Sequence, residues 1–165
     1  MKKEIKAIIF DLGNVLIFFD HKKASIPIAK KLGVSEKRVF DVLSGNKSGF
    51  IEFCEKGASE KEYWGYFSKE LGLQNISSKK MQELWNRIFW TNPTTLELSQ
   101  KLRKNYKLGL LSNTDLGHKI YLLKKHRLRL KFDALTFSCD IKSRKPSPKI
   151  YQTTLKKLGS LPEET

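Results

Sequence analysis

A short apolar run at residues 6–10, "KAIIF", constrains the fold of this chain more than any other feature. Its apolar residues follow one another without alternation, which is the pattern of a parallel strand that is covered on both faces. A single carboxylate, Asp11, comes directly after the run and is followed by Gly13. Similar runs recur at residues 108–112 ("LGLLS") and 133–138 ("DALTFS"). The sequence therefore predicts a buried parallel sheet with a carboxylate at the end of its first strand.

Helical signals fill the long interval between the first two of these strands. Each expected helix begins or ends at a capping residue. The helices are 36–45 after Ser35, 59–72 with a capping box of Ser59 and Glu62 and a terminal Gly72, 79–90 after Ser77 or Ser78, 94–105 after Pro93, and 149–158 between Ser147-Pro148 and Gly159. An interval of roughly ninety residues is too long for a simple crossover between strands, so it predicts an inserted helical subdomain.

The alternation of strands and helices predicts an α/β fold with a parallel sheet. Ligands of such sheets bind outside the carboxyl ends of the strands. The candidate site residues are therefore those that follow each strand, namely Asp11, then Ser112, Asn113, Thr114 and Asp115, then the loop 138–148 with Lys142, Arg144 and Lys145.

Together these residues contain the parts for phosphoryl transfer through a covalent aspartyl intermediate. A carboxylate at a strand end can act as nucleophile, the hydroxyl and amide groups of the next loop can bind phosphoryl oxygens, and a lysine offsets their charge. A nearby lysine also favours the ionised form of Asp11. Each part alone is commonplace, because an Asp after a strand is most often a turn or capping residue. The interpretation depends on the order and the strand-end placement of all the parts.

The same residues lie in segments that resemble the haloacid dehalogenase-like hydrolase superfamily, in particular a subgroup with a small helical cap. The matching segments are 10–16 ("FDLGNVL"), 110–115 ("LLSNTD"), 144–151 ("RKPSPKIY") and, for the cap, 50–64 ("FIEFCEKGASEKEYW"). The resemblance implies a Rossmann-like core at residues 1–18 and 93–165, with a helical cap at residues 19–92. It also implies a Mg²⁺-dependent hydrolase, most often a phosphatase of small phosphorylated metabolites.

The family roles carry over to the matching positions of this chain. Asp11 would be the nucleophile and a metal ligand, and the backbone carbonyl of Gly13 would be a second metal contact. Lys145 would balance the charge of the site. The phosphoryl group would be held by Ser112 and Asn113, together with Gly13 and Asn14 from the first motif.

The chain departs from the superfamily pattern at two places. Most members have a second Asp two positions after the nucleophile, which serves as general acid and base, and here that position is Gly13. Asp20 or a water could serve instead, although a surface or hinge role is favoured for Asp20. A fourth motif, a strand ending in paired acids, is expected after a segment similar to residues 161–165 ("LPEET"), where this sequence stops. We therefore expect a C-terminally truncated chain with an incomplete magnesium site.

The missing strand would also change the edge of the sheet. In the family, the strand of the fourth motif pairs with the free side of the first strand. Without that partner, residues 7–10 would form an exposed apolar edge. Such an edge favours self-association, so we expect the chain to associate with itself through its first strand.

The charge of the chain permits a second interpretation. Its 32 Lys and Arg residues exceed its 17 Asp and Glu residues, which gives a formal net charge of +15. Such an excess attracts nucleic acid, anionic lipid or phosphorylated metabolites, although a solvated basic helix face is its commoner origin. The alternative function is a non-catalytic, degenerate member of the fold that binds nucleic acid or another polyanion. A dehalogenase is a third option, because the same nucleophile can displace halide from carbon.

The remaining features indicate a cytoplasmic protein. The sequence shows no export signal and no apolar run of about 18 residues that would span a membrane. Cys54 and Cys139 lie in no metal-binding spacing and are expected to be reduced thiols. His118 is expected on a helix surface. Four aromatic residues of the cap are expected to pack in its core rather than line a substrate cavity, namely Tyr63, Trp64, Trp85 and Trp90.

Overall fold

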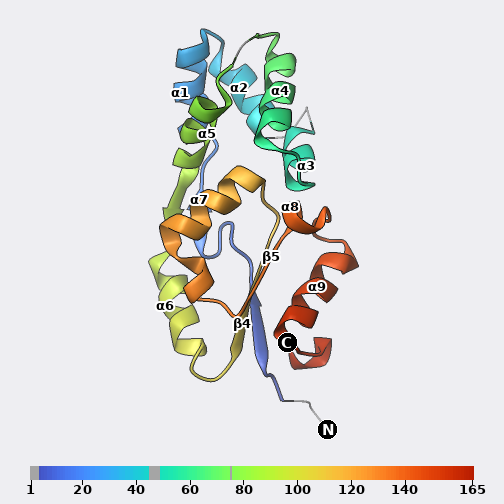
Figure 1. Ribbon diagram of the computed structural model, residues 1–165. Coiled ribbons are helices and arrows are strands. Elements are labelled where there is room, and N and C mark those ends of the chain that lie inside the picture. The colour runs from blue at the N-terminus through green and yellow to red at the C-terminus, as the bar shows by residue number, and fades with distance from the viewer. Residues whose placement is uncertain (1–3, 45–48, 75) are drawn as a thin grey trace.

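A three-stranded parallel sheet forms the base of the molecule in the computed structural model (Figure 1). The structure describes residues 4–44, 49–74 and 76–165, so residues 1–3 of the predicted core and Gly45 of the predicted helix 36–45 lie outside it. The strands are β1 (Ala7–Phe10), β4 (Lys107–Ser112) and β5 (Ala134–Phe137), in the order β1-β4-β5. All three fall within the predicted apolar runs or within one residue of them, and both pairings are parallel, as predicted.

Helices cover both faces of this sheet, which explains why its strands are apolar without alternation. In Figure 1, α6 (Pro93–Leu102) and α7 (Leu116–His126) lie on one side of the sheet and α9 (Pro148–Leu158) lies on the other. Leu108 and Leu110 pack in one cluster with Leu122 of α7, whereas Ala7 and Ala134 pack with Leu158 of α9. Short helical turns complete this part of the chain: η2 (Leu128–Leu130), α8 (Ser138–Ile141) and η3 (Pro162–Glu164).

Gly109 in β4 allows α9 to lie close against the sheet. A Cβ atom at this position would lie 2.9 Å from Leu158 Cδ1 and 3.2 Å from Ile9 Cγ1. We expect Gly109→Val to lower the free energy of unfolding by about 1–3 kcal/mol through overpacking, as measured by urea denaturation. Gly65→Ala is the matched control, because a Cβ atom there meets nothing within 4 Å. Equal stability of Gly109→Val and the wild-type protein would contradict this account.

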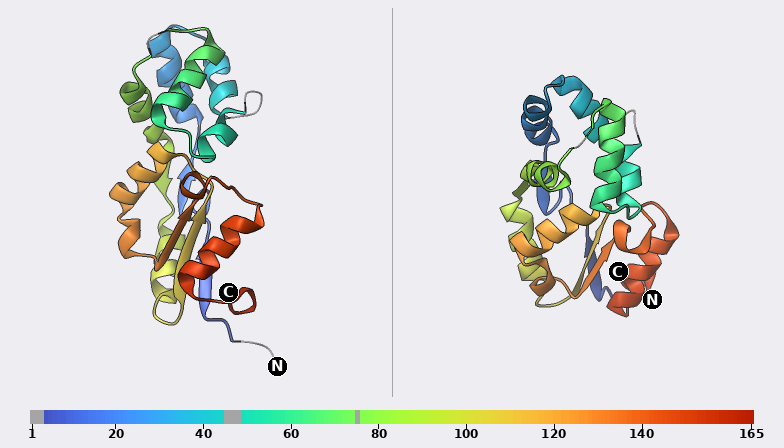
Figure 2. Two further views of the ribbon diagram at one scale, coloured as in Figure 1. Left: turned by 45° about the vertical axis from the view of Figure 1, so that its right-hand side comes forward. Right: turned by 45° about the horizontal axis from the view of Figure 1, so that its top comes forward.

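The five helices α1–α5 form a second layer, the helical lobe, above the carboxyl ends of the strands (Figures 1 and 2). They are α1 (Lys22–Leu32), α2 (Glu36–Leu43), α3 (Phe50–Glu55), α4 (Glu60–Leu71) and α5 (Ser78–Trp85). The predicted caps are confirmed: Ser35 caps α2, Ser59 and Glu62 form a capping box on α4, and Ser77 caps α5. None of the described helices is long and apolar enough to cross a membrane.

The lobe has a hydrophobic core of its own, as expected for an inserted helical subdomain. Tyr63 and Trp64 are fully buried in this core, so packing is their role as predicted. Trp85 is buried but also lines a cavity, and the prediction was incomplete for it. Trp90 is 41% exposed and lies under the Lys23 ammonium group, so its assignment to the core was wrong.

A two-stranded ribbon joins the lobe to the sheet. The chain enters the lobe through β2 (Ile17–Phe19) and leaves it through the turn η1 (Asn86–Ile88) and β3 (Phe89–Thr91), which pairs antiparallel with β2. The predicted helix 79–90 therefore ends early, at Trp85. Its last residues satisfy their backbone groups by pairing with β2, a tertiary contact that overrides their local helical pattern.

β1 lies at the rim of the sheet, as predicted, with β4 as its only strand partner among the described residues. Ala7 and Phe10 at the ends of this strand are buried, whereas Ile8 and Ile9 between them are partly exposed. The turn η3 lies at the start of this edge, where the Lys6 N–H donates to the Glu164 carbonyl at 2.7 Å. Self-association through β1 stays a prediction.

Candidate functional site

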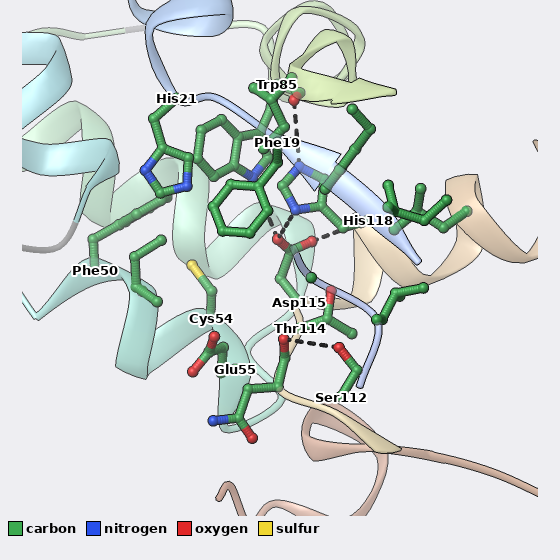
Figure 3. A pocket seen from close by; sticks show the side chains of 18 residues that line it. Phe19, His21, Phe50, Cys54, Glu55, Trp85, Ser112, Thr114, Asp115 and His118 are labelled. Atoms are coloured by element: carbon green, nitrogen blue, oxygen red, sulfur yellow. Dashed lines mark hydrogen bonds and ion pairs between the residues drawn. The ribbon is translucent and has the colours of Figure 1, made fainter. Parts of the chain in front are cut away.

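The candidate site lies where the carboxyl ends of the strands face the helical lobe (Figure 3). A cavity of about 130 Å³ occupies this boundary. Its walls combine residues that follow β1 and β4 with aromatic residues of the ribbon and lobe, among them Gly13, Phe19, Trp85, Ser112 and Asn113. Asp11 lies beside the cavity, since its neighbours Leu12 and Gly13 form part of the lining and Asp11 itself does not. The α/β topology therefore brings the predicted strand-end residues to one place.

Asp11 and Lys145 form an ion pair at the end of β1. The distance from Lys145 Nζ to Asp11 Oδ2 is 2.8 Å, and Asp11 Oδ1 accepts a hydrogen bond from the Leu12 N–H at 2.7 Å. The Asp11 side chain is still 43% exposed. It is therefore a carboxylate that is held by a cation yet accessible to a small molecule.

Asn113 holds Lys145 in position. Its Oδ1 accepts from the Lys145 N–H at 2.8 Å, and its Nδ2 donates to the Lys145 carbonyl at 3.3 Å. Both polar atoms of the Asn113 side chain are thus hydrogen-bonded to the backbone of Lys145. The loop itself is fixed by Ser138, whose hydroxyl accepts from the Thr114 N–H at 3.0 Å. Ser112 is buried at the end of β4, and its hydroxyl donates to the Asn113 carbonyl at 3.2 Å.

Gly13 and Asn14 form the turn after β1. Asn14 is exposed and has a left-handed backbone conformation with φ of 56°, which Asn tolerates better than most residues. Its N–H donates to the Ile17 carbonyl at 2.8 Å, which closes the turn into β2. Gly13 lines the cavity and Asn14 does not. Asp20 lies farther along, where its carboxylate accepts from the Lys22 N–H at the start of α1.

Few donors for a magnesium ion are present. The resemblance assigns the metal to the Asp11 carboxylate and the Gly13 carbonyl, whereas Mg²⁺ requires near-octahedral oxygen ligation. Across the described ranges 4–44, 49–74 and 76–165, no three His, Cys, Asp or Glu side chains converge so that they could hold a metal ion. The residues present therefore do not fit a complete magnesium site.

A buried Asp–His pair lies in the wall of the cavity, between the sheet and the lobe (Figure 3). Asp115 caps α7, and its Oδ1 accepts from the His118 N–H at 2.7 Å. Its Oδ2 lies 2.8 Å from His118 Nδ1 and accepts from Trp85 Nε1 at 3.3 Å. The His118 ring stacks on Trp85, and its Nε2 lies 3.3 Å from the Trp85 carbonyl. These contacts join α7 to the end of α5.

The prediction of a surface position for His118 was wrong, because His118 is 5% exposed. The helical lobe covers the start of α7, and Gly117 leaves room for Gln82 of α5, which a Cβ atom would meet at 2.4 Å. Burial by itself raises the pKa of Asp115, but the facing His118 and the hydrogen bonds from His118 and Trp85 outweigh it and hold the pKa below its usual range. The sequence did contain one signal of this pair, because Asp115 at the start of a helix lies three residues before His118.

His21 is enclosed by aromatic rings on the other side of Trp85. Its ring centroid lies 5.3 Å from that of Phe19 and 5.2 Å from that of Trp85. Burial and, to a smaller extent, the nearby His118 lower the pKa of His21 to about 4, although Asp20 opposes the shift. His21 is therefore neutral in the folded protein at neutral pH.

The neutral His21 makes stability depend on pH. The unfolded chain binds a proton at His21 below a pKa of about 6.5, whereas the folded protein binds it only near pH 4. Stability should therefore fall as the pH drops through this window, by up to about 1.4 kcal/mol per pH unit from this group. We expect His21→Phe to remove this part of the slope in urea denaturation between pH 7 and pH 5. An unchanged slope in the variant would contradict the assignment.

Both cysteines are buried free thiols. Burial raises the pKa of Cys54 strongly and that of Cys139 to about 12. Thiolates are the reactive form of cysteine, so neither residue has the character of a nucleophile. Cys54 lines the cavity as a small apolar group.

The motifs that supply Asp11, the 112–115 loop and Lys145 belong to a known family. The model of the haloacid dehalogenase-like hydrolases matches residues 5–165. The chain is a haloacid dehalogenase-like hydrolase. Its parallel sheet with a Rossmann-like arrangement, and the helices that cover it, are the fold that was predicted from these motifs.

Solved structures of haloacid dehalogenase-like proteins resemble the whole chain. An enzyme of the family from Bacteroides thetaiotaomicron is 29% identical with a TM-score of 0.81, over 99% of this chain and 83% of that one. A predicted hydrolase of the family from Porphyromonas gingivalis is 27% identical with a TM-score of 0.77, over 99% of this chain and 80% of that one. An L-2-haloacid dehalogenase from Xanthobacter autotrophicus, 21% identical with a TM-score of 0.69 over 97% and 67% of the two chains, shows the shared fold.

Proposed function

We propose that this hydrolase is a phosphatase that acts on small phosphate monoesters through an aspartyl-phosphate intermediate at Asp11. The observation that carries the proposal is the 2.8 Å contact between Lys145 Nζ and an Asp11 carboxylate that stays 43% exposed. A carboxylate nucleophile must be ionised and open to its substrate, and a cation beside it reduces the repulsion of an anionic ester.

The other residues support this reaction in different ways. Asp11 attacks phosphorus, and Lys145 offsets the negative charge that gathers on the phosphoryl oxygens. Ser112 lines the cavity at the end of β4, where its hydroxyl group would bind a phosphoryl oxygen. Asn113 acts through Lys145, because both polar atoms of its side chain hold the Lys145 backbone. Gly13 lines the cavity, and Asn14 shapes the turn that presents Gly13.

The helical lobe serves in this proposal as a cap over the substrate. Residues 19–92 would form the cap, and residues 1–18 and 93–165 would form the catalytic core. The cavity lies at the boundary between the two, with aromatic walls from the cap side and polar groups from the core side. Such a division places the phosphoryl group near the strand ends and the organic part of the substrate near the aromatic rings.

Relatives favour a phosphatase over a dehalogenase. A further structure of the Bacteroides enzyme is a complex with magnesium and inorganic phosphate. The match to this structure has 25% sequence identity. The dehalogenase from Xanthobacter is less similar, at 21% identity. A phosphate ester is therefore the substrate to test first.

Magnesium enters the proposal as the cofactor of the family. Magnesium complexes of the Bacteroides enzyme are known, and this chain offers the Asp11 carboxylate and the Gly13 carbonyl as contacts. These two contacts alone make an incomplete site, so we expect hydrolysis by this chain to depend on a high concentration of added Mg²⁺ and to stop when EDTA removes it. Hydrolysis that EDTA leaves unchanged would contradict the metal part of the proposal.

Hydrolysis of phosphate esters tests the proposal directly. The purified chain, with saturating Mg²⁺, should release phosphate from p-nitrophenyl phosphate, and an acid quench should trap phosphate bound to the protein. If the chain hydrolyses none of the aryl phosphates tested, the proposal is overturned for this chain. Polyanion binding is the rival function that the net charge of +15 favours, and it predicts salt-sensitive binding of nucleic acid without turnover.

A further inference from the structure

One carboxylate of the helical lobe faces the cavity from above, and its role is not yet assigned. Glu55 is the last residue of α3 and lines the same cavity as Gly13, Ser112 and Asn113. Its side chain is 14% exposed. In Figure 3, Glu55 lies below Cys54, beside the loop that carries Thr114 and Ser112. A partly buried acid from the lobe is thus placed in the wall of the same cavity as the residues at the strand ends.

Arg144 holds this acid from the core side. Arg144 Nη2 lies 2.8 Å from Glu55 Oε2, and Arg144 precedes Lys145, the partner of Asp11. The lobe and the core are close together here, since a Cβ atom on Gly57 would lie 2.6 Å from the Cys139 carbonyl oxygen. Glu55 is therefore joined by an ion pair to the residue next to Lys145, at a place where the lobe lies close to the core.

The surroundings of Glu55 favour its protonated form more than water does. Burial raises the pKa of Glu55, and the nearby charge of Asp115 raises it further, while Arg144 and Lys145 act in the opposite direction. The net direction is upward. A carboxyl group with a raised pKa in the wall of the cavity is suited to give up a proton during a reaction and to take it back afterwards.

Within the described part of the chain, two carboxyl groups line the cavity, Glu55 and Asp115. Asp115 is held by His118 and Trp85 on both of its oxygens. Glu55 has an ion pair with Arg144 through Oε2, but no hydrogen bond satisfies this buried oxygen in the structure. Gly13 has no side chain, and the Asp20 carboxylate accepts from the Lys22 N–H at the start of α1.

We propose that Glu55 is the general acid and base of this hydrolase, delivered to the reaction by the helical lobe. The inference rests on the proposed phosphatase function. As an Asp11 oxygen bonds to phosphorus and the bond from phosphorus to the ester oxygen breaks, the Glu55 O–H gives its proton to that oxygen, which leaves as an alcohol. Arg144 stabilises the resulting carboxylate. Glu55 then takes a proton from the water that attacks the aspartyl phosphate, which releases inorganic phosphate and the Asp11 carboxylate.

Leaving groups of different basicity test this role. Phenoxide needs a proton to depart, whereas dinitrophenoxide departs without one. We expect Glu55→Gln to lower kcat/KM for phenyl phosphate by about 10²–10⁴-fold and that for dinitrophenyl phosphate far less, because a general acid contributes on this scale only where the leaving group needs it. The basic limb of the pH profile for phenyl phosphate should disappear in the same variant.

Glu52→Gln is the matched control. Glu52 lies on the same helix and 3.9 Å from the same Arg144, but it is 50% exposed and does not line the cavity. We expect this variant to hydrolyse both esters at wild-type rates. If Glu55→Gln does not fold, as judged by circular dichroism, Glu55→Asp replaces it, and this variant should keep the basic limb of the profile with a lower rate on phenyl phosphate.

The outcomes separate the two proposals. If Glu55→Gln lowers kcat/KM equally for both esters, or for neither, the acid role of Glu55 is overturned and the phosphatase function stays in place. A wild-type chain that hydrolyses neither ester overturns the phosphatase function, and the acid role falls with it. A selective loss on phenyl phosphate supports both.

Discussion

Asp11→Asn is expected to abolish phosphate-ester hydrolysis while the protein stays folded. The amide cannot attack phosphorus as the carboxylate does, and loss of the nucleophile in a covalent enzyme lowers kcat by roughly 10⁴-fold or more. The amide oxygen can still accept the hydrogen bond that the Leu12 N–H gives to Asp11 Oδ1. Because the side chain is 43% exposed, loss of its contact with Lys145 should change the free energy of unfolding by less than about 1 kcal/mol.

Initial rates on p-nitrophenyl phosphate and a urea denaturation curve measure the two parts of this prediction. Asp20→Asn is the control, because Asp20 is a nearby acid whose carboxylate accepts from the Lys22 N–H, and an Asn oxygen can accept the same bond. We expect Asp20→Asn to retain wild-type rates. Substantial activity in Asp11→Asn would exclude Asp11 as the nucleophile, and a large loss in Asp20→Asn would assign the proton transfer to Asp20 instead of Glu55.

The strands and capped helices could be predicted because their signals are local. The apolar runs at β1 and β4 reflect burial on two faces, and the Ser59–Glu62 capping box depends on residues three positions apart. Placement of Asp11 and Lys145 at one site also followed, since parallel strands present their carboxyl ends on the same side. Order along the chain was sufficient for these features.

Other features depend on contacts between distant segments and leave little local trace. The ribbon of β2 and β3 has three residues in each strand, too few for a periodic pattern, and its register is set by pairing across the chain. Pro27 lies inside α1, where a proline is normally a sign against a helix. The burial of His118 and the place of Glu55 in the cavity wall depend on how the lobe packs over the sheet. This packing cannot be read from the sequence of either segment alone.

Asp115→Asn is expected to destabilise the protein more than any other single substitution in the site. The Asp115 side chain is 6% exposed, and its charge faces His118 Nδ1 at 2.8 Å. Replacement of this buried carboxylate by an amide removes the charge-assisted hydrogen bonds that it makes with His118 and Trp85, and we expect a loss of about 3 kcal/mol. Asn is as good a helix cap as Asp, so the cap of α7 is kept and the loss measures the charge.

The pH dependence of the wild-type protein gives a second measure of the same pair. The pKa of Asp115 is lower in the folded protein than in the unfolded chain. Its contribution to stability is therefore fully present above the ordinary Asp pKa of about 4 and is lost as the pH falls through the lower folded value. Asp115→Asn should lack this acid-dependent loss, and urea denaturation of both proteins between pH 6 and pH 3 measures it.

Asp140→Asn is the matched control for the buried pair. Asp140 is 40% exposed and pairs with Lys119, one residue from His118, so the same helix α7 carries a surface ion pair and a buried one. Exposed pairs contribute less than about 1 kcal/mol, because water and salt screen them. Comparable losses in Asp140→Asn and Asp115→Asn would show that burial does not strengthen the Asp115–His118 pair. A loss confined to Asp115→Asn would show that burial strengthens the contacts of Asp115 with His118 and Trp85.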